Sequence, residues 1–306
     1  MKSVLVRFFF TFFFVSSSSF GHYDFITAQA YLLVEKDSLE IIDGKNFDKE
    51  FPPASTTKVV TSIVALERLS PNEWIVAPKE VLSIPPSKMG LKPKKKYRAI
   101  DLIKGMLVKS ANDAAYAIAC HVSKTEERFT EIMNATARRL GALKTNFKNA
   151  SGLYDPEQYT TCRDLVLIFR YALDLEPFRR IVSAKFFDFQ DGRNLVRFQN
   201  RNRFLFCFEP AIGGKTGYTK ASRHSYVGAF EKDGKIYILS ILASEDLWGD
   251  ATLILSNLYD SVPGKEEIEK AKAKDVVLAS YKPKKHSAMK DRIKLKSAKP
   301  KRKQRK

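Results

Sequence analysis

Residues 53–58 read PASTTK, and the residues that follow, VVTSIVALER, are largely apolar. This stretch predicts a helix over residues 55–69 that begins with a hydroxyl, Ser55, and an amine, Lys58, one turn apart. Positions i and i+3 share a face of a helix, so the Lys58 amine can reach the Ser55 hydroxyl. Free backbone N–H groups in the first turn also favour negative charge there. The pattern indicates an activated serine or, more simply, a capped helix start with a solvated lysine.

Lys58 can take a proton from Ser55 only as a neutral amine, whereas a free lysine has a pKa of about 10.4. Burial on an apolar helix lowers the pKa of an amine, and a second cation nearby lowers it further. Lys215 supplies such a cation if the strand predicted to begin there passes the start of the helix. The sequence therefore predicts that Lys58 is buried close to Lys215.

Two further short motifs carry polar side chains that suit the same chemistry. SAN at residues 110–112 falls between two predicted helices, where Ser110 offers a second hydroxyl for proton relay and Asn112 an amide to hold a peptide group. KTG at residues 215–217 opens a predicted strand. Lysine and a hydroxyl together suit a carboxylate, and Gly217 leaves out a side chain that would block a substrate along the strand. Each motif alone also fits a plain polar turn or strand entry.

The periodicity changes from helical to strand-like near Pro177. Residues 26–44 predict two strands around a polar turn, and helices follow as far as Pro177, one of them starting at a Ser123–Glu126 capping box. Two Asp-Gly hairpins come next, FFDFQDGRNLVRFQ and YVGAFEKDGKIYILSILAS, and a last helix is predicted over residues 251–259. This order of elements predicts an α+β fold with an antiparallel sheet.

The three motifs and their flanks together resemble a known family. Ser-x-x-Lys, Ser-x-Asn and Lys-Thr-Gly in this order, set within PPASTTKVVTSIVALE, LVKSANDAAYAIA, NASGLY and GGKTGYT, resemble the low-molecular-mass penicillin-binding proteins. These are serine-type D-alanyl-D-alanine carboxypeptidases, and the resemblance covers about residues 26–262. It implies a DD-peptidase/β-lactamase-like fold, in which the active site lies between an antiparallel sheet and a helical cluster. It also implies peptidoglycan stem peptides as substrates and β-lactam antibiotics as covalent inhibitors.

The resemblance also assigns a role to each motif residue. Ser55 would be the acylated nucleophile and Lys58 its base, and Ser110 would pass the proton to the leaving D-alanine. The substrate-binding groups that it implies are Asn112, Lys215, Thr216, Gly217, the backbone N–H of Tyr218 in an oxyanion hole with that of Ser55, and Arg201 near the terminal carboxylate. No metal and no cofactor are implied.

Some features depart from the family or leave other functions open. Family members usually have Ala-Gly shortly after the third motif, where this chain has Ser222-Arg223-His224. No Glu has an Asn four residues further along the chain, which argues against a class A β-lactamase. The motif GxSxG is absent, which argues against a Ser-His-Asp hydrolase. A D,D-endopeptidase cutting peptidoglycan cross-links would use the same residues. A non-catalytic envelope-binding protein working through a basic tail is a further alternative.

Charge and hydropathy divide the chain into three parts. Residues 1–21, with Lys2 and Arg7 around a short apolar run and small residues before Gly21, predict a signal peptide. Residues 22–262 form the predicted catalytic domain, with a net charge of +5, and residues 263–306 a basic tail of +12, within a total of +19. We therefore expect a protein exported to the periplasm or cell envelope and peripheral to the membrane.

The basic tail indicates possible binding partners, and the cysteines indicate neither a metal site nor a disulfide. A basic tail can contact an anionic membrane or wall surface, or can simply be solvated, and export argues against nucleic acid. The β-rich second domain and amphipathic anchor of many family members are not expected here. The three cysteines, Cys120, Cys162 and Cys207, form no metal-binding pattern and are expected to be unpaired.

Overall fold

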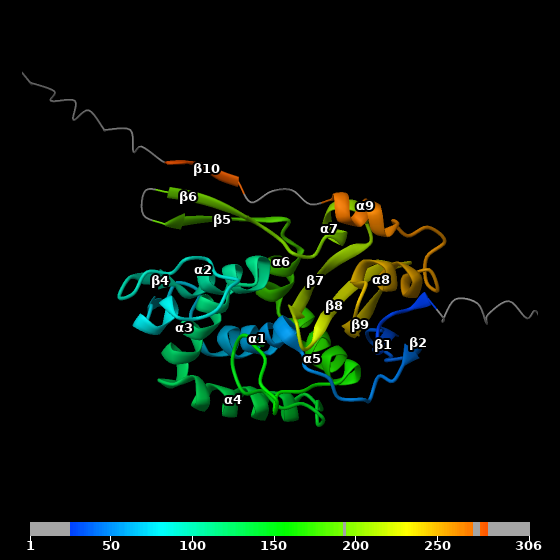
Figure 1. Ribbon diagram of the computed structural model, residues 1–306, viewed down its shortest axis with the longest axis horizontal. Coiled ribbons are helices and arrows are strands. Elements are labelled where there is room, and N and C mark those ends of the chain that lie inside the picture. The colour runs from blue at the N-terminus through cyan, green and yellow to red at the C-terminus, as the bar shows by residue number, and fades with distance from the viewer. Residues whose placement is uncertain (1–24, 192–193, 272–275, 281–306) are drawn as a thin grey trace, which may run out of the picture.

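The computed structural model describes residues 25–191, 194–271 and 276–280. An antiparallel sheet with strand order β2-β1-β9-β8-β7 runs through the molecule (Figure 1). Its strands are β1 (Ala30–Glu35), β2 (Ile41–Lys45), β7 (Ala211–Thr219), β8 (Arg223–Lys232) and β9 (Lys235–Ser244). The two N-terminal strands and the central β8–β9 hairpin are therefore confirmed, as is the predicted α+β class with an antiparallel sheet.

Alternate residues of the central strands face two separate cores. In β1, Leu32 and Val34 belong to the larger core, whereas Tyr31 and Leu33 belong to the smaller one. Both faces of the sheet are therefore covered. The larger core lies under the helical cluster, which consists of α1 (Lys58–Arg68), α2 (Ala99–Lys104), α3 (Asn112–Ser123), α4 (Glu126–Arg139), α5 (Cys162–Asp174) and α6 (Glu176–Ser183).

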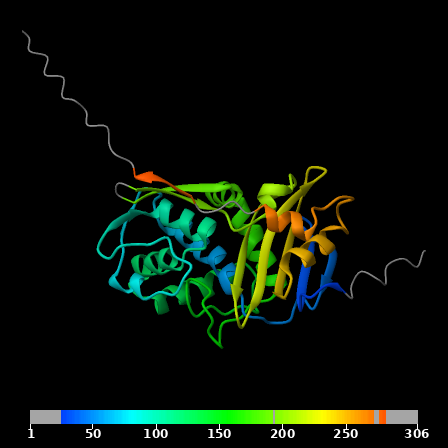
Figure 2. The same cartoon turned by 45° about the horizontal axis from the view of Figure 1, so that its top comes forward.

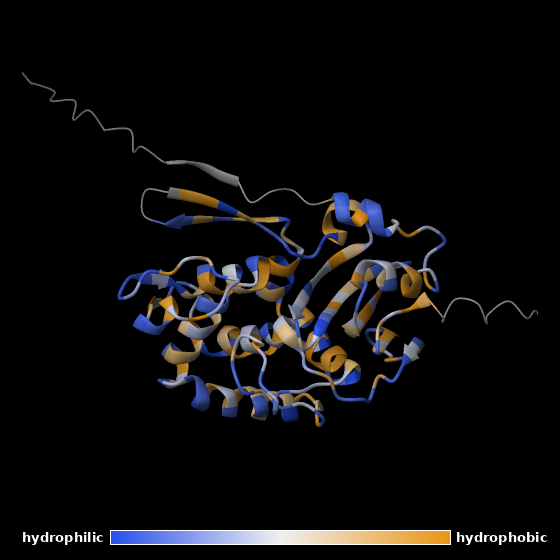
Figure 3. Cartoon of the chain, viewed as in Figure 1, coloured by the Kyte–Doolittle hydropathy of each residue, from blue (hydrophilic) through white to orange (hydrophobic). Residues whose placement is uncertain are grey.

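The smaller core lies on the opposite face of the sheet, under three short helices. They are α7 (Phe204–Cys207), α8 (Leu247–Leu255) and α9 (Lys265–Lys270), and Figure 2 shows them on the other side of β7–β9 from the helical cluster. Figure 3 shows α9 and the outer side of α4 as largely hydrophilic, as expected for elements at the surface. No helix among the described residues is long and apolar enough to cross a lipid bilayer.

Helix α1 occupies the centre of the molecule. Every residue from 58 to 65 is buried, and the helix packs against α3, α4, α5 and α6. A helix that is apolar on all sides belongs in a core, which explains the run VVTSIVAL. The 3₁₀ turn η2 (Ala54–Thr57) leads directly into α1 and touches β7. The predicted helix over 55–69 is confirmed, with its first turn in the 3₁₀ form.

Two smaller sheets flank the helical cluster. β5 (Phe186–Asp191) and β6 (Asn194–Gln199) form the first predicted Asp-Gly hairpin, and β10 (Val276–Ser280) adds to β6. β3 (Trp74–Val76) and β4 (Lys96–Arg98) form a two-stranded ribbon. Two further turns complete the elements, the 3₁₀ turn η3 (Lys79–Leu82) and the π-helical turn η4 (Gly105–Lys109).

Several element boundaries differ from the predictions. Helix α4 is capped by Thr125, whose hydroxyl accepts a hydrogen bond from the N–H of Arg128, so the predicted capping box at Ser123 is wrong. Ser123 instead ends α3. The last predicted helix begins earlier, at Leu247, because the Asp246 side chain caps it. Strand β7 likewise begins before the KTG motif, at Ala211.

The predicted start of the basic tail at residue 263 is too early. Ile268 of α9 is completely buried in the smaller core, and β10 pairs with β6. Residues 263–280 carry four Lys/Arg and four Asp/Glu, so the whole +12 of the tail lies in residues 281–306. Folded elements thus occur as far along the chain as Ser280, and the rest of the predicted tail, like the predicted signal peptide, lies outside the described residues.

Candidate active site

Ser55 and Lys58 lie next to each other where η2 meets α1. Lys58 is the first residue of α1 and is completely buried, and its Nζ is 2.8 Å from Ser55 Oγ. The turn η2 has no side-chain cap, so the Ser55 hydroxyl is not used to hold the helix start. Lys58 is therefore buried, as predicted, and the alternative of a capped helix start with a solvated lysine is excluded.

Lys58 Nζ contacts three oxygens. Besides Ser55 Oγ, it lies 2.7 Å from Asn112 Oδ1 and 2.5 Å from the carbonyl oxygen of Ser151. Amide and carbonyl oxygens only accept hydrogen bonds. A neutral amine therefore donates its two N–H groups to Asn112 and Ser151 and directs its lone pair at the Ser55 hydroxyl. Proton transfer from Ser55 to Lys58 requires this arrangement.

The surroundings of Lys58 favour its neutral form. Burial holds the pKa of Lys58 well below its usual range, and the charge of Lys215 lowers it further. The carboxylates of Asp113 and Glu126 act in the opposite direction. Asp113 accepts hydrogen bonds from the backbone N–H groups of residues 89–91, so its charge is already partly satisfied.

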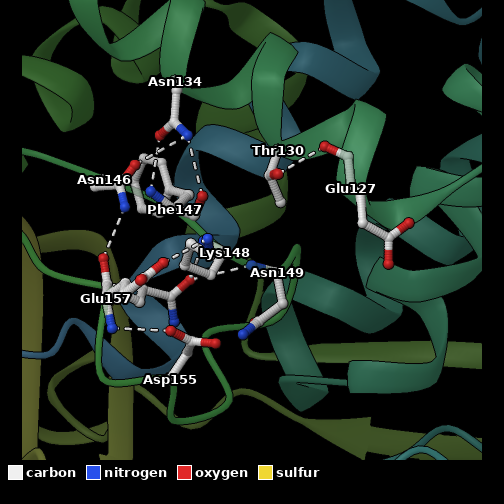
Figure 4. A network of polar contacts seen from close by, with 10 residues as sticks. Glu127, Thr130, Asn134, Asn146, Phe147, Lys148, Asn149, Asp155 and Glu157 are labelled. Atoms are coloured by element: carbon white, nitrogen blue, oxygen red, sulfur yellow. Dashed lines mark hydrogen bonds and ion pairs between the residues drawn. The ribbon is translucent and has the colours of Figure 1, made fainter.

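The Ser151 carbonyl was not among the predicted site residues. It belongs to the loop between α4 and α5, where Asn149 Oδ1 accepts a hydrogen bond from the N–H of Gly152 at 2.7 Å. Asn134 of α4 holds the same loop by bonding both backbone groups of Phe147 (Figure 4). The segment NASGLY, with Asn before small residues, is typical of such a side-chain-stabilised turn. This pattern was the feature of the sequence from which the loop could have been predicted.

Two glycines allow the chain to pack closely around η2. A Cβ on Gly152, which has φ +81°, would lie 1.8 Å from the carbonyl oxygen of Ala54. A Cβ on Gly217 of β7 would lie 2.7 Å from the backbone nitrogen of Ser55. Gly217 was predicted to leave room for a substrate and it lines the cleft; its missing side chain also lets β7 approach the backbone of Ser55.

Ser110 and Asn112 point into the site from the junction of η4 and α3. Ser110 has φ 66° and ψ 37°, a left-handed conformation that is uncommon outside glycine and typical of constrained functional positions. Its Oγ lies 2.9 Å from Lys215 Nζ. Asn112 Nδ2 donates to the carbonyl oxygen of Pro85, which leaves Oδ1 directed at Lys58.

Lys215 lies on β7, beside Ser110, and is also buried. Burial and the nearby charge of Arg201 lower the pKa of Lys215 to about 7. Its Nζ donates to the carbonyl oxygen of Thr216 at 2.6 Å as well as contacting Ser110 Oγ. Lys215 contacts Ser110 and Lys58 contacts Asn112, two residues further along, so both amines lie against the same motif, as predicted.

A cleft of about 640 Å³ opens above these buried amines. Seven of the predicted residues line it: Ser55, Ser110, Asn112, Arg201, Thr216, Gly217 and Tyr218. Lys58 and Lys215 contact the serines from beneath. The lining contains no Asp or Glu, and neither Arg201 nor Arg203 pairs with a described acidic residue. The cleft is therefore suited to an anionic ligand.

The departure at residues 222–224 shapes the far end of the cleft. Ser222 Oγ accepts a hydrogen bond from the N–H of Thr219 at 3.0 Å, and Arg223 has φ 55° and pairs with Glu245. The His224 ring lies 4.6 Å from the Tyr218 ring and lines the cleft. Burial lowers the pKa of His224. Arg223 therefore holds a left-handed backbone conformation that a glycine would adopt without strain.

Among the described residues, no cysteine lines this cleft. Cys120, Cys162 and Cys207 are unpaired, and burial raises the pKa of the Cys162 thiol to about 12. No three His, Cys, Asp or Glu side chains of the described ranges come together as metal ligands.

Together, the sheet flanked by helices and a serine held against a buried lysine define a class of protein: serine acyl-transfer enzymes with a DD-peptidase-like fold. A profile of the D-alanyl-D-alanine carboxypeptidases, peptidase family S11, matches residues 18–245. The chain belongs to this family.

Individual relatives agree with this assignment. The chain is 35% identical over 219 residues to D-alanyl-D-alanine carboxypeptidase DacB2 of Mycobacterium tuberculosis, covering 70% of this chain and 74% of the relative. It is 30% identical over 230 residues to DacC of Escherichia coli, covering 71% of this chain and 56% of the relative. The chain thus spans little more than half the length of the E. coli protein.

Solved structures show the same fold. A D-alanyl-D-alanine carboxypeptidase from M. tuberculosis superposes with a TM-score of 0.72 at 31% identity, covering 78% of this chain and 92% of that one. Penicillin-binding protein 5 from Haemophilus influenzae gives 0.71 at 29% identity, covering 76% and 70%. The predicted DD-peptidase/β-lactamase-like fold is confirmed.

Proposed function

We propose that the protein is a serine-type D-Ala-D-Ala carboxypeptidase that removes the terminal D-alanine from peptidoglycan pentapeptides and is inhibited by penicillin. One observation carries the proposal: the buried Lys58 amine contacts Ser55 Oγ, while Asn112 Oδ1 and the Ser151 carbonyl occupy its two remaining directions. This makes Ser55 the nucleophile and Lys58 its base. Membership of the carboxypeptidase family supplies the substrate class.

Acylation begins with proton transfer from Ser55 Oγ to Lys58 Nζ. Oγ then attacks the carbonyl carbon of the penultimate D-alanine, and the oxyanion is stabilised by the backbone N–H groups of Ser55 and Tyr218. As the C–N bond breaks, the proton reaches the departing amine through the Ser110 hydroxyl, which lies 2.9 Å from Lys215 Nζ. Free D-alanine leaves, and the shortened peptide remains as an ester on Ser55.

Deacylation repeats these steps with water in place of the hydroxyl. Water loses a proton to the amine of Lys58 and attacks the ester carbon, and Ser55 Oγ regains a proton as the bond to it breaks. Asn112 holds the substrate backbone, and Lys215 and Thr216, with Arg201 beside them, bind the carboxylate of the leaving residue. Penicillin would form the same ester on Ser55 and release no leaving group that could diffuse away.

Lys215 gives the reaction a predicted pH dependence. The pKa of Lys215 is lowered to about 7, and only the protonated amine attracts a carboxylate. Raising the pH through this value removes the proton, so kcat/KM should fall on the alkaline side, by about tenfold per pH unit well above the pKa. Lys215→Arg, whose guanidinium stays charged, should retain much of the activity and lose this alkaline fall. An unchanged alkaline fall in Lys215→Arg would contradict the assignment.

The activity itself is tested with two substrates and one inhibitor. The protein should release D-alanine from a pentapeptide ending in D-Ala-D-Ala and should be labelled covalently by a fluorescent penicillin. Cleavage of a cross-linked muropeptide without release from the pentapeptide would replace the proposal with a D,D-endopeptidase. Absence of both cleavage and labelling would leave a non-catalytic envelope-binding protein.

We also propose that the protein acts outside the cytoplasm, in the cell envelope. The charged start, apolar run and small residues of 1–21 support removal of this segment as a signal peptide. The catalytic domain then extends from residue 22 to Ser280, because α9 and β10 belong to the folded part. Residues 281–306 form the basic tail, with thirteen Lys/Arg and one Asp.

A further inference from the structure

The β3–β4 ribbon presents an exposed face that combines apolar and basic side chains. Trp74 pairs with Arg98 and Val76 with Lys96, so these four side chains share one face of the ribbon, which we call the ribbon face. Trp74 is 53% exposed and Val76 49%. Ile75 and Tyr97, the alternate residues, are buried in the larger core.

The two cations of the ribbon face are not neutralised by a direct ion pair. Among the described residues, neither Lys96 nor Arg98 forms an ion pair; the Arg98 guanidinium lies 5.5 Å from the centre of the Trp74 ring and donates to Asn72 Oδ1. Glu73 beside them is held by His121 at 2.8 Å. The ribbon face thus has the composition of an interfacial site, an aromatic ring and an aliphatic side chain between two unpaired cations.

The positive charge of the catalytic domain concentrates in the same segment. Residues 79–98 carry seven Lys/Arg and one Glu, a balance of +6, whereas residues 22–262 as a whole carry +5. Apart from this segment, the rest of 22–262 is therefore close to neutral. Lys92 and Lys95 of this segment pair with Asp191, but Lys94 and Lys96 pair with no acid of the described residues. Leu82, also in this segment, is 67% exposed.

The basic tail starts at the same end of the molecule. Ser280, the last described residue, pairs with Asn194, which pairs with Asp191 at the tip of the β5–β6 hairpin. Asp191 in turn holds Lys92 and Lys95, close to β4. Figures 1 and 2 both place β10 and β4 at one end of the molecule. Ser280, which residues 281–306 with their charge of +12 follow in the sequence, therefore lies at the same end of the molecule as the β3–β4 ribbon.

We propose that the ribbon face docks on the surface of an anionic lipid bilayer. The cations meet acidic headgroups, while Trp74 and Val76 enter the interfacial layer. An anionic wall polymer would use the cations and could stack a sugar ring on Trp74, but it offers no apolar layer for exposed Val76. None of the four residues lines the active-site cleft. The proposal does not depend on the enzymatic activity.

Sedimentation of the full chain with vesicles tests the proposal. The protein should bind vesicles that contain phosphatidylglycerol and should not bind phosphatidylcholine alone, and added salt should weaken binding. Lys96→Gln with Arg98→Gln should weaken partition by about 25-fold, at about fivefold per charge. The matched control, Lys49→Gln with Lys235→Gln, removes two exposed lysines elsewhere and should change partition far less. Equal effects of the two pairs would overturn the proposal.

Fluorescence separates docking of the ribbon face from attraction of the tail. The chain has two tryptophans, and Trp248 is 9% exposed, so Trp248→Phe leaves Trp74 as the reporter. Its emission should shift to the blue on anionic vesicles and be quenched by brominated acyl chains, also after deletion of residues 281–306. Trp74→Phe in the otherwise native chain should lose the shift. Sedimentation without any Trp74 response, or binding to wall sacculi but not to vesicles, would overturn the proposal.

Discussion

Ser55→Ala should abolish both D-alanine release and covalent labelling by penicillin. Ser55 Oγ is the hydroxyl in contact with the buried Lys58 amine, and the turn that carries it lies against Gly217 of β7. Alanine offers no atom that can form the ester. The loss in turnover should be on the order of 10⁶-fold, the size seen when a nucleophilic serine is removed from a catalytic unit. Time-resolved labelling with a fluorescent penicillin measures it directly.

The Ser55→Ala protein should remain folded, so its loss of activity can be attributed to the missing hydroxyl. The Ser55 side chain caps no helix, and Lys58 keeps its contacts with Asn112 and Ser151. We expect a change in the free energy of unfolding of at most about 1 kcal/mol. Ser83→Ala, in the exposed turn after η3, is the matched control and should retain full labelling. A covalent adduct on the Ser55→Ala protein would shift the assignment of nucleophile to Ser110.

Local sequence patterns were sufficient to predict those elements whose conformation depends on a few neighbouring residues. The Asp-Gly pairs fix two hairpins, and the apolar run after Lys58 fixes the central helix, because turn chemistry and periodicity act over a few residues. The capping residue of α4 was misplaced by two positions, since both Ser123 and Thr125 are suitable caps. Only the end of α3, which includes Ser123, decides between them.

Features that depend on tertiary contacts could not be predicted in the same way. The acceptor of the Lys58 N–H at Ser151 is a backbone carbonyl, so no side-chain type marks it. The close packing that requires a glycine at position 217, with a Cβ there 2.7 Å from the Ser55 nitrogen, also depends on tertiary structure. The boundary at 263 failed because α9 has a single buried apolar residue, Ile268, and its burial depends on a core assembled from distant strands.

The assignment of the base gives the second large effect, through Lys58→Arg. A guanidinium stays protonated at all working pH values and cannot accept the Ser55 proton. General base catalysis contributes about 10²- to 10⁴-fold, so kcat and the rate of acylation by penicillin should fall by that factor. Lys215→Arg, which preserves the cation proposed to bind the carboxylate, should lose much less. The comparison is fair because both lysines are buried and both changes add the same bulk.

The pH profile then distinguishes loss of the base from simple distortion of the site. In the native protein, acylation should fall as the pH drops through the pKa of Lys58, which burial and Lys215 hold well below the usual range of lysine. Protonated Lys58 has no lone pair for the Ser55 hydroxyl, so this acidic fall is the signature of the base. Lys58→Arg should lose the acidic fall, whereas Lys215→Arg should keep it, and thermal melting of both variants establishes that they are folded. Equal losses of kcat in the two folded variants, with the acidic fall intact in Lys58→Arg, would mean that Lys58 orders the site and does not take the proton.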